Sequence, residues 1–286
     1  MVHLFFTIDL RYDVTSPGAD FIFNLQATRT QRQHLLEESL VINQRVDIRS
    51  SEDASTRTRI FRLNAFQGPL ALTYSATVEI EHLISNPYEV FEIPVTDLPD
   101  EVLPYLYPSR YCQSDRFATL AMSQFGHLPR GYQRVDAIQR WVRQNVIFRK
   151  KASTSVTSAI ETLEQNSGVC RDFAHLMIAL CRALSIPARY TTGIDYGADP
   201  ALGPTDFHAY VEVYLSHHWY IFDPSCAAIP MGFVRLGTGR DAADASFATI
   251  FGDVTSQLPM LQIGALRDPA RGWELPMHRW EALSTD

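Results

Sequence analysis

The chain is 286 residues long, with 46% apolar and 20% charged residues. This length suffices for one large domain or two ordinary ones with a buried core, and the composition excludes disordered, collagen-like and coiled-coil proteins. The 25 Lys and Arg residues and 32 Asp and Glu residues leave a net charge of −7. An acidic chain lacks the positive surface that binds a phosphate backbone, so we expect no nucleic-acid partner.

The sequence also bears on compartment and on cysteine chemistry. No apolar run approaches the roughly 20 residues of a membrane helix, and residues 1–9 carry no basic leader of the kind that begins a signal peptide. We therefore expect a cytoplasmic protein without a membrane partner. The four cysteines form no C-x-x-C pair, which excludes a zinc ribbon and a thioredoxin motif. Each should be a buried small residue or a reactive thiol.

Residues 1–85 are rich in strand patterns. Apolar and polar residues alternate from Leu4 to Val14 and again from Leu70 to Ile80, which is the period of a strand with one buried face. Shorter alternating runs lie between these two, separated by turn residues. Several amphipathic strands at this spacing predict an antiparallel β-sandwich domain. The region gathers no catalytic residue types, so we interpret it as a packing or recognition module.

The composition changes in residues 86–130. Five of the 16 prolines fall within the first half of this segment, and such a stretch can supply neither a continuous helix nor a central strand. We predict that it is a linker or a wrapping segment. The last residues, 267–286, have no regular period and form a C-terminal tail, which Trp273 and Trp280 predict to dock on the protein.

Residues 131–266 combine helices with a later sheet. The apolar period is helical in three segments and then alternates as it does in strands. The expected helices are 133–146, 158–165 and 170–184, and the expected strands are 189–194, 208–215 and 219–222. Helices that precede an antiparallel sheet define an α+β core.

The strongest chemical signal is the segment 167–175, SGVCRDFAH. Gly168 permits a tight turn, and Cys170 then falls in the first turn of an amphipathic helix. The unpaired backbone N–H groups at a helix start carry partial positive charge, which favours the thiolate form of a cysteine. A nucleophilic cysteine also needs a base, and the base needs a carboxylate that orients it.

A histidine and an aspartate lie on two neighbouring predicted strands. His208 opens the first and Asp223 closes the second. With a two-residue turn at 215–216 the two residues lie directly opposite each other; with one at 216–217, Asp223 is the diagonal neighbour of His208 on the same face, about 7–8 Å away by backbone. Only a three-residue turn would separate the two side chains. The spacing therefore permits a histidine–aspartate pair.

Other chemistry-bearing residues have simpler interpretations. Cys112, Cys181 and Cys226 are interpreted as structural, although Cys226 lies close to Asp223 in the chain. His175 is on a different side of the predicted helix from the cysteine at its start, and we expect it to pack or to accept a hydrogen bond rather than act as a second base. No metal-ligand spacing supports a zinc site among these residues and the candidate site.

Three acidic residues, Asp195, Asp199 and Asp206, punctuate a loop that is rich in glycine and proline. Acidic loops can bind calcium, but this one lacks the dense alternating carboxylates of a calcium loop. We interpret it as a solvated loop beside a cleft, and we expect no metal and no other cofactor.

The motifs resemble those of the bacterial transglutaminase-like superfamily, members of which are often labelled cysteine proteases. The resemblance rests on three ordered segments, 168–175 (GVCRDFAH), 206–214 (DFHAYVEVY) and 219–225 (WYIFDPS), and extends to 107–112 (YPSRYC) and 239–244 (GRDAAD). The β-rich beginning resembles the N-terminal region of that family, so nearly the whole chain is covered. The resemblance implies a papain-like or transglutaminase-like α+β core, with helices packed on an antiparallel sheet, preceded by the β-sandwich domain.

The same resemblance implies a catalytic triad of Cys170, His208 and Asp223. It implies thiol-dependent acyl transfer at amides of a peptide or protein substrate, through a thioester on the cysteine. We expect hydrolysis to be favoured over cross-linking. Transamidation of the transglutaminase type is the alternative outcome of the same intermediate. A non-catalytic peptide-binding scaffold that retains the fold is the alternative outside catalysis.

Overall fold

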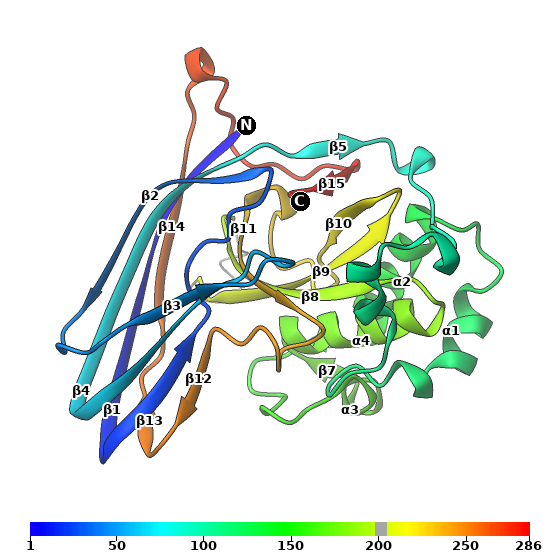
Figure 1. The fold of residues 1–286 in the computed structure, drawn as a ribbon. Coiled ribbons are helices and arrows are strands. Elements are labelled where there is room, and N and C mark those ends of the chain that lie inside the picture. The colour runs from blue at the N-terminus through cyan, green and yellow to red at the C-terminus, as the bar shows by residue number, and fades with distance from the viewer. Residues whose placement is uncertain (198–204) are drawn as a thin grey trace.

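The computed structural model describes residues 1–197 and 205–286. Its main layers are a long-stranded sheet, a second sheet and a group of helices (Figure 1). The long-stranded sheet, sheet A, is built on β1 (Val2–Phe23) and β4 (Arg59–Ile80), which pair antiparallel along almost their whole length. Its other strands are β2 (Gln33–Ile42), β3 (Arg49–Glu52), β12 (Ala248–Phe251), β13 (Val254–Ser256) and β14 (Met260–Leu266).

Sheet A has one buried face, as the alternating pattern predicts. Apolar side chains of β1 and β4 pack there against side chains of the second sheet, including Ile194, Val234 and Leu236. The first 85 residues therefore do not form a sandwich by themselves, because β1–β4 lie in a single sheet and the second layer comes from later in the chain. An alternating strand requires an apolar partner layer, but its pattern does not say which segment supplies that layer.

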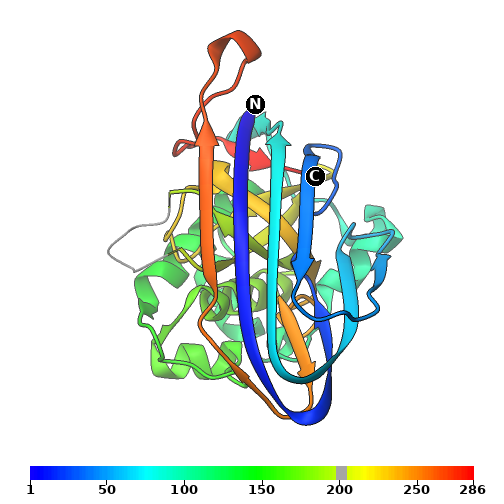
Figure 2. The same ribbon diagram turned by 90° about the vertical axis from the view of Figure 1, so that its left-hand side faces the viewer.

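Strands from the end of the chain complete sheet A. Figure 2 shows β14, β1, β4 and β2 side by side, with the second sheet and the helices behind them. β14 pairs with the first half of β1, from His3 to Asp9, and β12 and β13 pair with the later part of the same strand. Residues 248–266 thus belong to the sheet of the N-terminal region, so the predicted boundaries at 85 and 266 do not separate the layers of the structure.

The second sheet, sheet B, has the strand order β11-β8-β9-β10-β15-β5. The bounds are β5 Leu83–Ser85, β8 Ala188–Asp195, β9 Phe207–Leu215, β10 His218–Phe222, β11 Phe233–Gly239 and β15 Ala282–Ser284. The C-terminal tail docks, as predicted: β15 lies between β10 and β5, and Trp273 stacks on His3 with ring centroids 4.0 Å apart. Trp280, by contrast, is 68% exposed.

The helices cover one face of sheet B. They are α1 (Ala118–Phe125), α2 (Tyr132–Asn145), α3 (Ala159–Gln165) and α4 (Cys170–Ala183). α4 is the central helix: almost all of its side chains are buried, against β8 and β9 on one side and the other helices around it. This α+β arrangement confirms the predicted fold class of the core. No helix in the described part of the chain combines the length and apolar character that crossing a lipid bilayer requires.

The proline-rich segment contains short 3-10 turns, and its middle part, residues 98–105, packs on the face of sheet B opposite the helices. The turns are Pro87–Glu89, Val95–Asp97, Asp100–Leu106 and Ser114–Arg116. Val102 and Tyr105 pack there against Tyr214 and Trp219. α1 follows within residues 86–130, so the predicted linker also contains a helix, which begins after the last of its clustered prolines.

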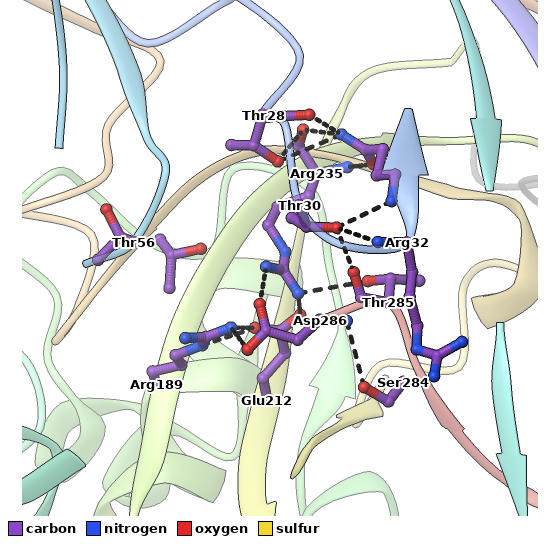
Figure 3. Close-up of polar contacts among 12 residues, drawn as sticks. Thr28, Thr30, Arg32, Thr56, Arg189, Glu212, Arg235, Ser284, Thr285 and Asp286 are labelled. Atoms are coloured by element: carbon purple, nitrogen blue, oxygen red, sulfur yellow. Dashed lines mark hydrogen bonds and ion pairs between the residues drawn. The ribbon is translucent and has the colours of Figure 1, made fainter. Parts of the chain in front are cut away.

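A buried group of charges joins the strands of sheet B to the end of the chain (Figure 3). Glu212 on β9 is fully buried and accepts hydrogen bonds from Arg189 on β8, at 2.7 Å, and from Arg235 on β11. Arg235 also donates to Asp286 at 2.9 Å. The backbone around Arg235 is tied to the start of β2, because the Gln33 amide bonds to both its N–H and its carbonyl oxygen. We call Arg189, Glu212, Arg235 and Asp286 the buried ionic cluster.

Candidate active site

Cys170 is the first residue of α4 and is partly exposed. The first N–H groups of a helix have no partner within the helix, so the Cys170 sulfur lies at the positive end of α4. The chain enters the helix from a short parallel pair of β6 (Ile147–Phe148) and β7 (Ser167–Gly168). The carboxylate of Asp172 accepts a hydrogen bond from the Val169 N–H at 2.8 Å and fixes this entry. The predicted position of Cys170 in the first helical turn is confirmed.

Gly168 is needed at this entry for space. A Cβ atom at this position would lie 2.6 Å from the Asp172 Cβ, closer than such atoms approach each other. Its backbone is not in the left-handed region that favours glycine, unlike the residue before β7, Asn166, which has a φ of 50°. The glycine therefore allows the carboxylate of Asp172 to approach the turn before α4, rather than permitting an unusual backbone conformation.

His208 lies near the start of β9 and is 6% exposed. The hairpin that carries it turns at Ser216 and His217, with Leu215 opposite His218. Both turn residues have positive φ, 44° and 65°, as a two-residue hairpin turn of type I′ requires. This is the second of the two predicted registers, in which Asp223 is the diagonal neighbour of His208 on the same face.

Asp223 directly follows β10 and is held by the turn after it. Its Oδ1 accepts hydrogen bonds from the backbone and side chain of Ser225, at 3.1 and 2.6 Å, and its Oδ2 accepts one from the Ala227 N–H at 3.0 Å. With these donors fixing the carboxylate, Oδ1 lies 3.3 Å from Nε2 of His208. The distance is that of an ion pair, while the ring N–H is not aligned for a good hydrogen bond. The structure thus brings His208 and Asp223 together.

The charges of this pair support each other. Burial disfavours the charged form of His208, but the Asp223 carboxylate and then the Cys170 side chain raise the pKa of the ring well above the usual value. Burial likewise works against a charged Asp223, yet the attraction of His208 and the hydrogen bonds of the turn lower the pKa of the carboxyl. The ring is therefore imidazolium over a wider pH range than a free histidine.

Asp195 is the site residue that the sequence analysis missed. It ends β8, is 3% exposed, and its Oδ2 lies 3.6 Å from Nδ1 of His208. The pairing of Gly193 with His208 explains this position, because Asp195 lies two residues further along the same face of the strand. The interpretation of Asp195 as part of a solvated loop is wrong; Asp199 lies outside the described residues.

The surrounding motifs brace the start of α4 rather than supply reactive groups. His175 is fully buried, stacks on Tyr111 and accepts a hydrogen bond from the Ala242 N–H at 3.1 Å, as its predicted packing role requires. Asp241 accepts the Tyr111 N–H at 2.9 Å. Segments 107–112 and 239–244 are thereby tied to each other and to α4.

The other cysteines differ in exposure. Cys112 and Cys181 are buried in the core, as predicted. Cys226 is exposed and lines a cavity of about 810 Å³ beside Asp223, which α2 and the C-terminal segment also wall. Within residues 1–197 and 205–286, no three His, Cys, Asp or Glu side chains are arranged so that they could hold a metal ion.

A cysteine at the start of a buried helix, together with a histidine on one strand that contacts an aspartate after the next, is an arrangement typical of papain-like α+β proteins. The comparisons with known proteins narrow this class. The model of the transglutaminase-like superfamily core matches residues 118–224, and that of the bacterial transglutaminase N-terminal domain matches residues 5–101. The chain belongs to the transglutaminase-like superfamily.

Similar proteins agree with this membership. A protein from Cytophaga hutchinsonii, whose crystal structure is designated a putative cysteine protease, is 39% identical, with a TM-score of 0.92 over 100% of this chain and 98% of that one. An uncharacterized protein from Mycobacterium leprae is 30% identical over 196 residues, 64% of this chain and 68% of that protein. An uncharacterized Mycobacterium tuberculosis protein is 32% identical over 108 residues, and this chain spans only 34% of its length.

Proposed function

We propose that this protein is a cysteine protease or amidase that acts on peptide or protein substrates, with Cys170, His208 and Asp223 as its catalytic triad. The observation that carries the proposal is the buried pair of His208 and Asp223, whose ring nitrogen and carboxylate oxygen are 3.3 Å apart, and the Cys170 side chain is among the groups that raise the pKa of this ring. The position of Cys170 at the start of α4 adds the positive end of a helix.

Each atom has a role in this mechanism. The Cys170 thiolate attacks the amide carbonyl carbon and forms a C–S bond, while the oxyanion accepts a hydrogen bond from the backbone N–H of Cys170, worth about 3 kcal/mol in comparable sites. The C–N bond then breaks as Nδ1 of His208 gives its proton to the leaving amine. Asp223, at Nε2, holds the ring in the productive tautomer and stabilises the imidazolium.

The thioester then has two fates. Water that loses a proton to His208 attacks the thioester, the C–S bond breaks, and the acid and the thiolate are released; a primary amine in place of water gives transamidation. We favour hydrolysis, because the Cytophaga hutchinsonii relative, which matches along the whole chain, is designated a putative cysteine protease. A peptide library incubated with and without an added primary amine separates the two: free acids in both samples mean hydrolysis, and products that carry the amine mean transamidation.

Alkylation by iodoacetamide tests the activated cysteine directly. Cys226 is the internal control, since it is more exposed than Cys170 while burial raises the pKa of its thiol. We expect Cys170 to be alkylated at least about tenfold faster than Cys226 near pH 7, because the thiolate is the reacting form. Peptide mass spectrometry of the native protein at a series of times measures both rates in one sample.

Two variants complete this test. His208→Ala should slow alkylation of Cys170 while Cys226 keeps its rate, and Cys170→Ala should abolish turnover while the thermal midpoint stays within a few degrees of that of the unmodified protein. If exposure alone governs the rate of alkylation, Cys226 reacts before Cys170, and this result would favour the non-catalytic scaffold. If Cys170→Ala unfolds, the cysteine is a core residue and the proposal fails.

A further inference from the structure

The mechanism above leaves the second carboxylate beside His208 without a role. Asp223 lies beside Nε2, whereas Oδ2 of Asp195 lies 3.6 Å from Nδ1, the nitrogen to which the mechanism proposed above assigns proton transfer. The ring therefore lies between two carboxylates on opposite sides. All three groups are almost fully buried, with exposed fractions of 6% for His208, 3% for Asp195 and 4% for Asp223.

The charges around the ring come from several elements. Asp195 ends β8, Asp223 follows β10, Cys170 begins α4, and Asp206 lies just before β9. Burial is the largest cause that raises the pKa of Asp195; the positive charge of His208 acts against it, and the negative charges of Asp223 and, more weakly, Asp206 add to it. A buried carboxylate is costly unless a positive group compensates it, and for Asp195 the group in contact is the imidazolium.

We propose that Asp195 is a positioning residue whose negative charge beside Nδ1 of His208 keeps the ring protonated and so sets the upper pH limit at which the ring can act as an acid. The inference rests on the proposed function for its catalytic meaning. The ring must be protonated to give a proton to the leaving amine, and two flanking carboxylates keep it protonated to higher pH than Asp223 alone. Asp195 belongs to β8 and not to α4, so its charge also acts on the ring when the sulfur is bound in the thioester.

The test measures the protonation of His208 without requiring activity. In the Cys170→Ala background, the only carboxylates in contact with the ring among the described residues are Asp195 and Asp223. Nitrogen-15 NMR of histidine-labelled protein, with the His208 signal assigned through His208→Gln, gives the titration midpoint of the ring. Addition of Asp195→Asn should lower this midpoint by at least about one pH unit, since an opposite charge at this distance shifts a pKa by that much.

Asp206→Asn is the matched control, because it removes an exposed carboxylate near Asp195 that does not contact the ring. It should move the midpoint by less than half as much. A midpoint that does not move in Asp195→Asn would mean that Asp195 is neutral or uncoupled, and would overturn the inference. If Asp195→Asn unfolds at a lower temperature than its parent, Asp195→Ser removes the same charge with a smaller side chain. An unchanged titration midpoint of His208 in that variant would also overturn the inference.

Activity then separates this inference from the proposed function. In the protein with Cys170 intact, Asp195→Asn should move the alkaline fall of kcat to lower pH by the same interval and leave KM nearly unchanged, because the residue acts through the ring. If the His208 titration midpoint moves as expected but alkylation shows no preference for Cys170, the catalytic proposal is refuted. The role of Asp195 in keeping the ring protonated then still stands. An unmoved alkaline limb in an active enzyme would refute the role of Asp195 alone.

Discussion

At the scale of single residues, Asp223 has both a structural and an electrostatic role. It fixes the turn that follows β10, by accepting hydrogen bonds from Ser225 and Ala227, and it places a negative charge 3.3 Å from His208. An asparagine has the same shape but a single acceptor oxygen and no charge. Substitution at this one position therefore tests orientation and charge together.

We expect Asp223→Asn to reduce kcat by about 10⁴-fold, as loss of the orienting carboxylate does in other triads. A peptide substrate found in the library screen supplies the assay, and Ser225→Ala is the control, since it removes one hydrogen bond to the carboxylate but keeps the charge. Unchanged turnover in Asp223→Asn would remove this residue from the mechanism. A loss of similar size in Ser225→Ala would point to the shape of the turn rather than to the charge.

The same substitution predicts how stability depends on pH. The folded pKa of Asp223 is lowered, so its contribution is present above the unfolded value of about 3.9 and is lost as pH falls through the folded value. The folded pKa of His208 is raised, so its contribution is complete below about 6.5 and is lost as pH rises through the folded value. Asp223→Asn should therefore lower the thermal midpoint most near pH 5–6 and progressively less below pH 4. An equal decrease at pH 3 and pH 6 would contradict this coupling.

At the scale of elements, the start of α4 depends on one close approach. Gly168 leaves room for Asp172, whose carboxylate caps the Val169 N–H, and the Gly168 carbonyl accepts the Arg149 N–H at 2.9 Å. A methyl group at residue 168 must displace either the cap or the strand pair. The first turn of the helix carries Cys170, so a displacement there changes the site as well as the fold.

We expect Gly168→Ala to reduce the free energy of unfolding by about 1–3 kcal/mol, the usual cost of an added group in a filled space. Alkylation of Cys170 should slow in the folded protein. Gly237→Ala is the matched control, because a Cβ on that strand glycine of β11 meets nothing closer than 3.6 Å and should cost little. Urea unfolding measures the stability of both variants, and the alkylation rate of Cys170 is measured at pH 7 without denaturant. Equal effects of Gly168→Ala and Gly237→Ala would contradict the role of the close approach.

Elements that form from local sequence were the ones that could be predicted. The amphipathic period located α4, and a two-residue turn restricted the register of His208 and Asp223 to values that keep them on one face. Asp195 could not be placed in the same way, because its approach to His208 depends on the pairing of β8 with β9, which are joined by a long loop. Its one signal was a charged residue directly after an apolar strand. The pairing of β14 with β1 was even less predictable, because almost the whole chain separates the two strands.

At the scale of the whole molecule, the layers are not independent of each other. One apolar core contains side chains of sheet A together with Ile194, Val234 and Leu236 of sheet B. The buried ionic cluster lies on sheet B, where Thr28, from the segment before β2, bonds to the Arg235 carbonyl and the C-terminal Asp286 bonds to the Arg235 side chain (Figure 3). Chain segments that lead into sheet A thus depend on charges that are paired within sheet B.

Glu212 is the centre of this cluster, and we expect its substitution to destabilise both sheets. Glu212→Gln keeps the shape but leaves the guanidinium groups of Arg189 and Arg235 without the charge between them, while Asp286 remains as their second partner. Breaking a buried ion pair on one side costs about 3–5 kcal/mol. We expect a loss of that size in the free energy of unfolding, and a single unfolding transition, because the shared core does not allow sheet A to stay folded when sheet B is lost.

Urea unfolding followed by far-ultraviolet circular dichroism and by tryptophan fluorescence measures both expectations. The fluorescence reports on sheet B through Trp219, which stacks on Arg189 at 4.1 Å, and on the edge of sheet A through Trp273. Glu52→Gln is the control, since its ion pair with Arg57 is exposed and such pairs contribute about 0–1 kcal/mol. If Glu212→Gln unfolds at the same urea concentration as Glu52→Gln, the buried ionic cluster makes no net contribution to stability. Two separate transitions would show that sheet A holds together without its partner layer, so that the division predicted near residue 85 describes a unit of stability even though it does not describe a sheet.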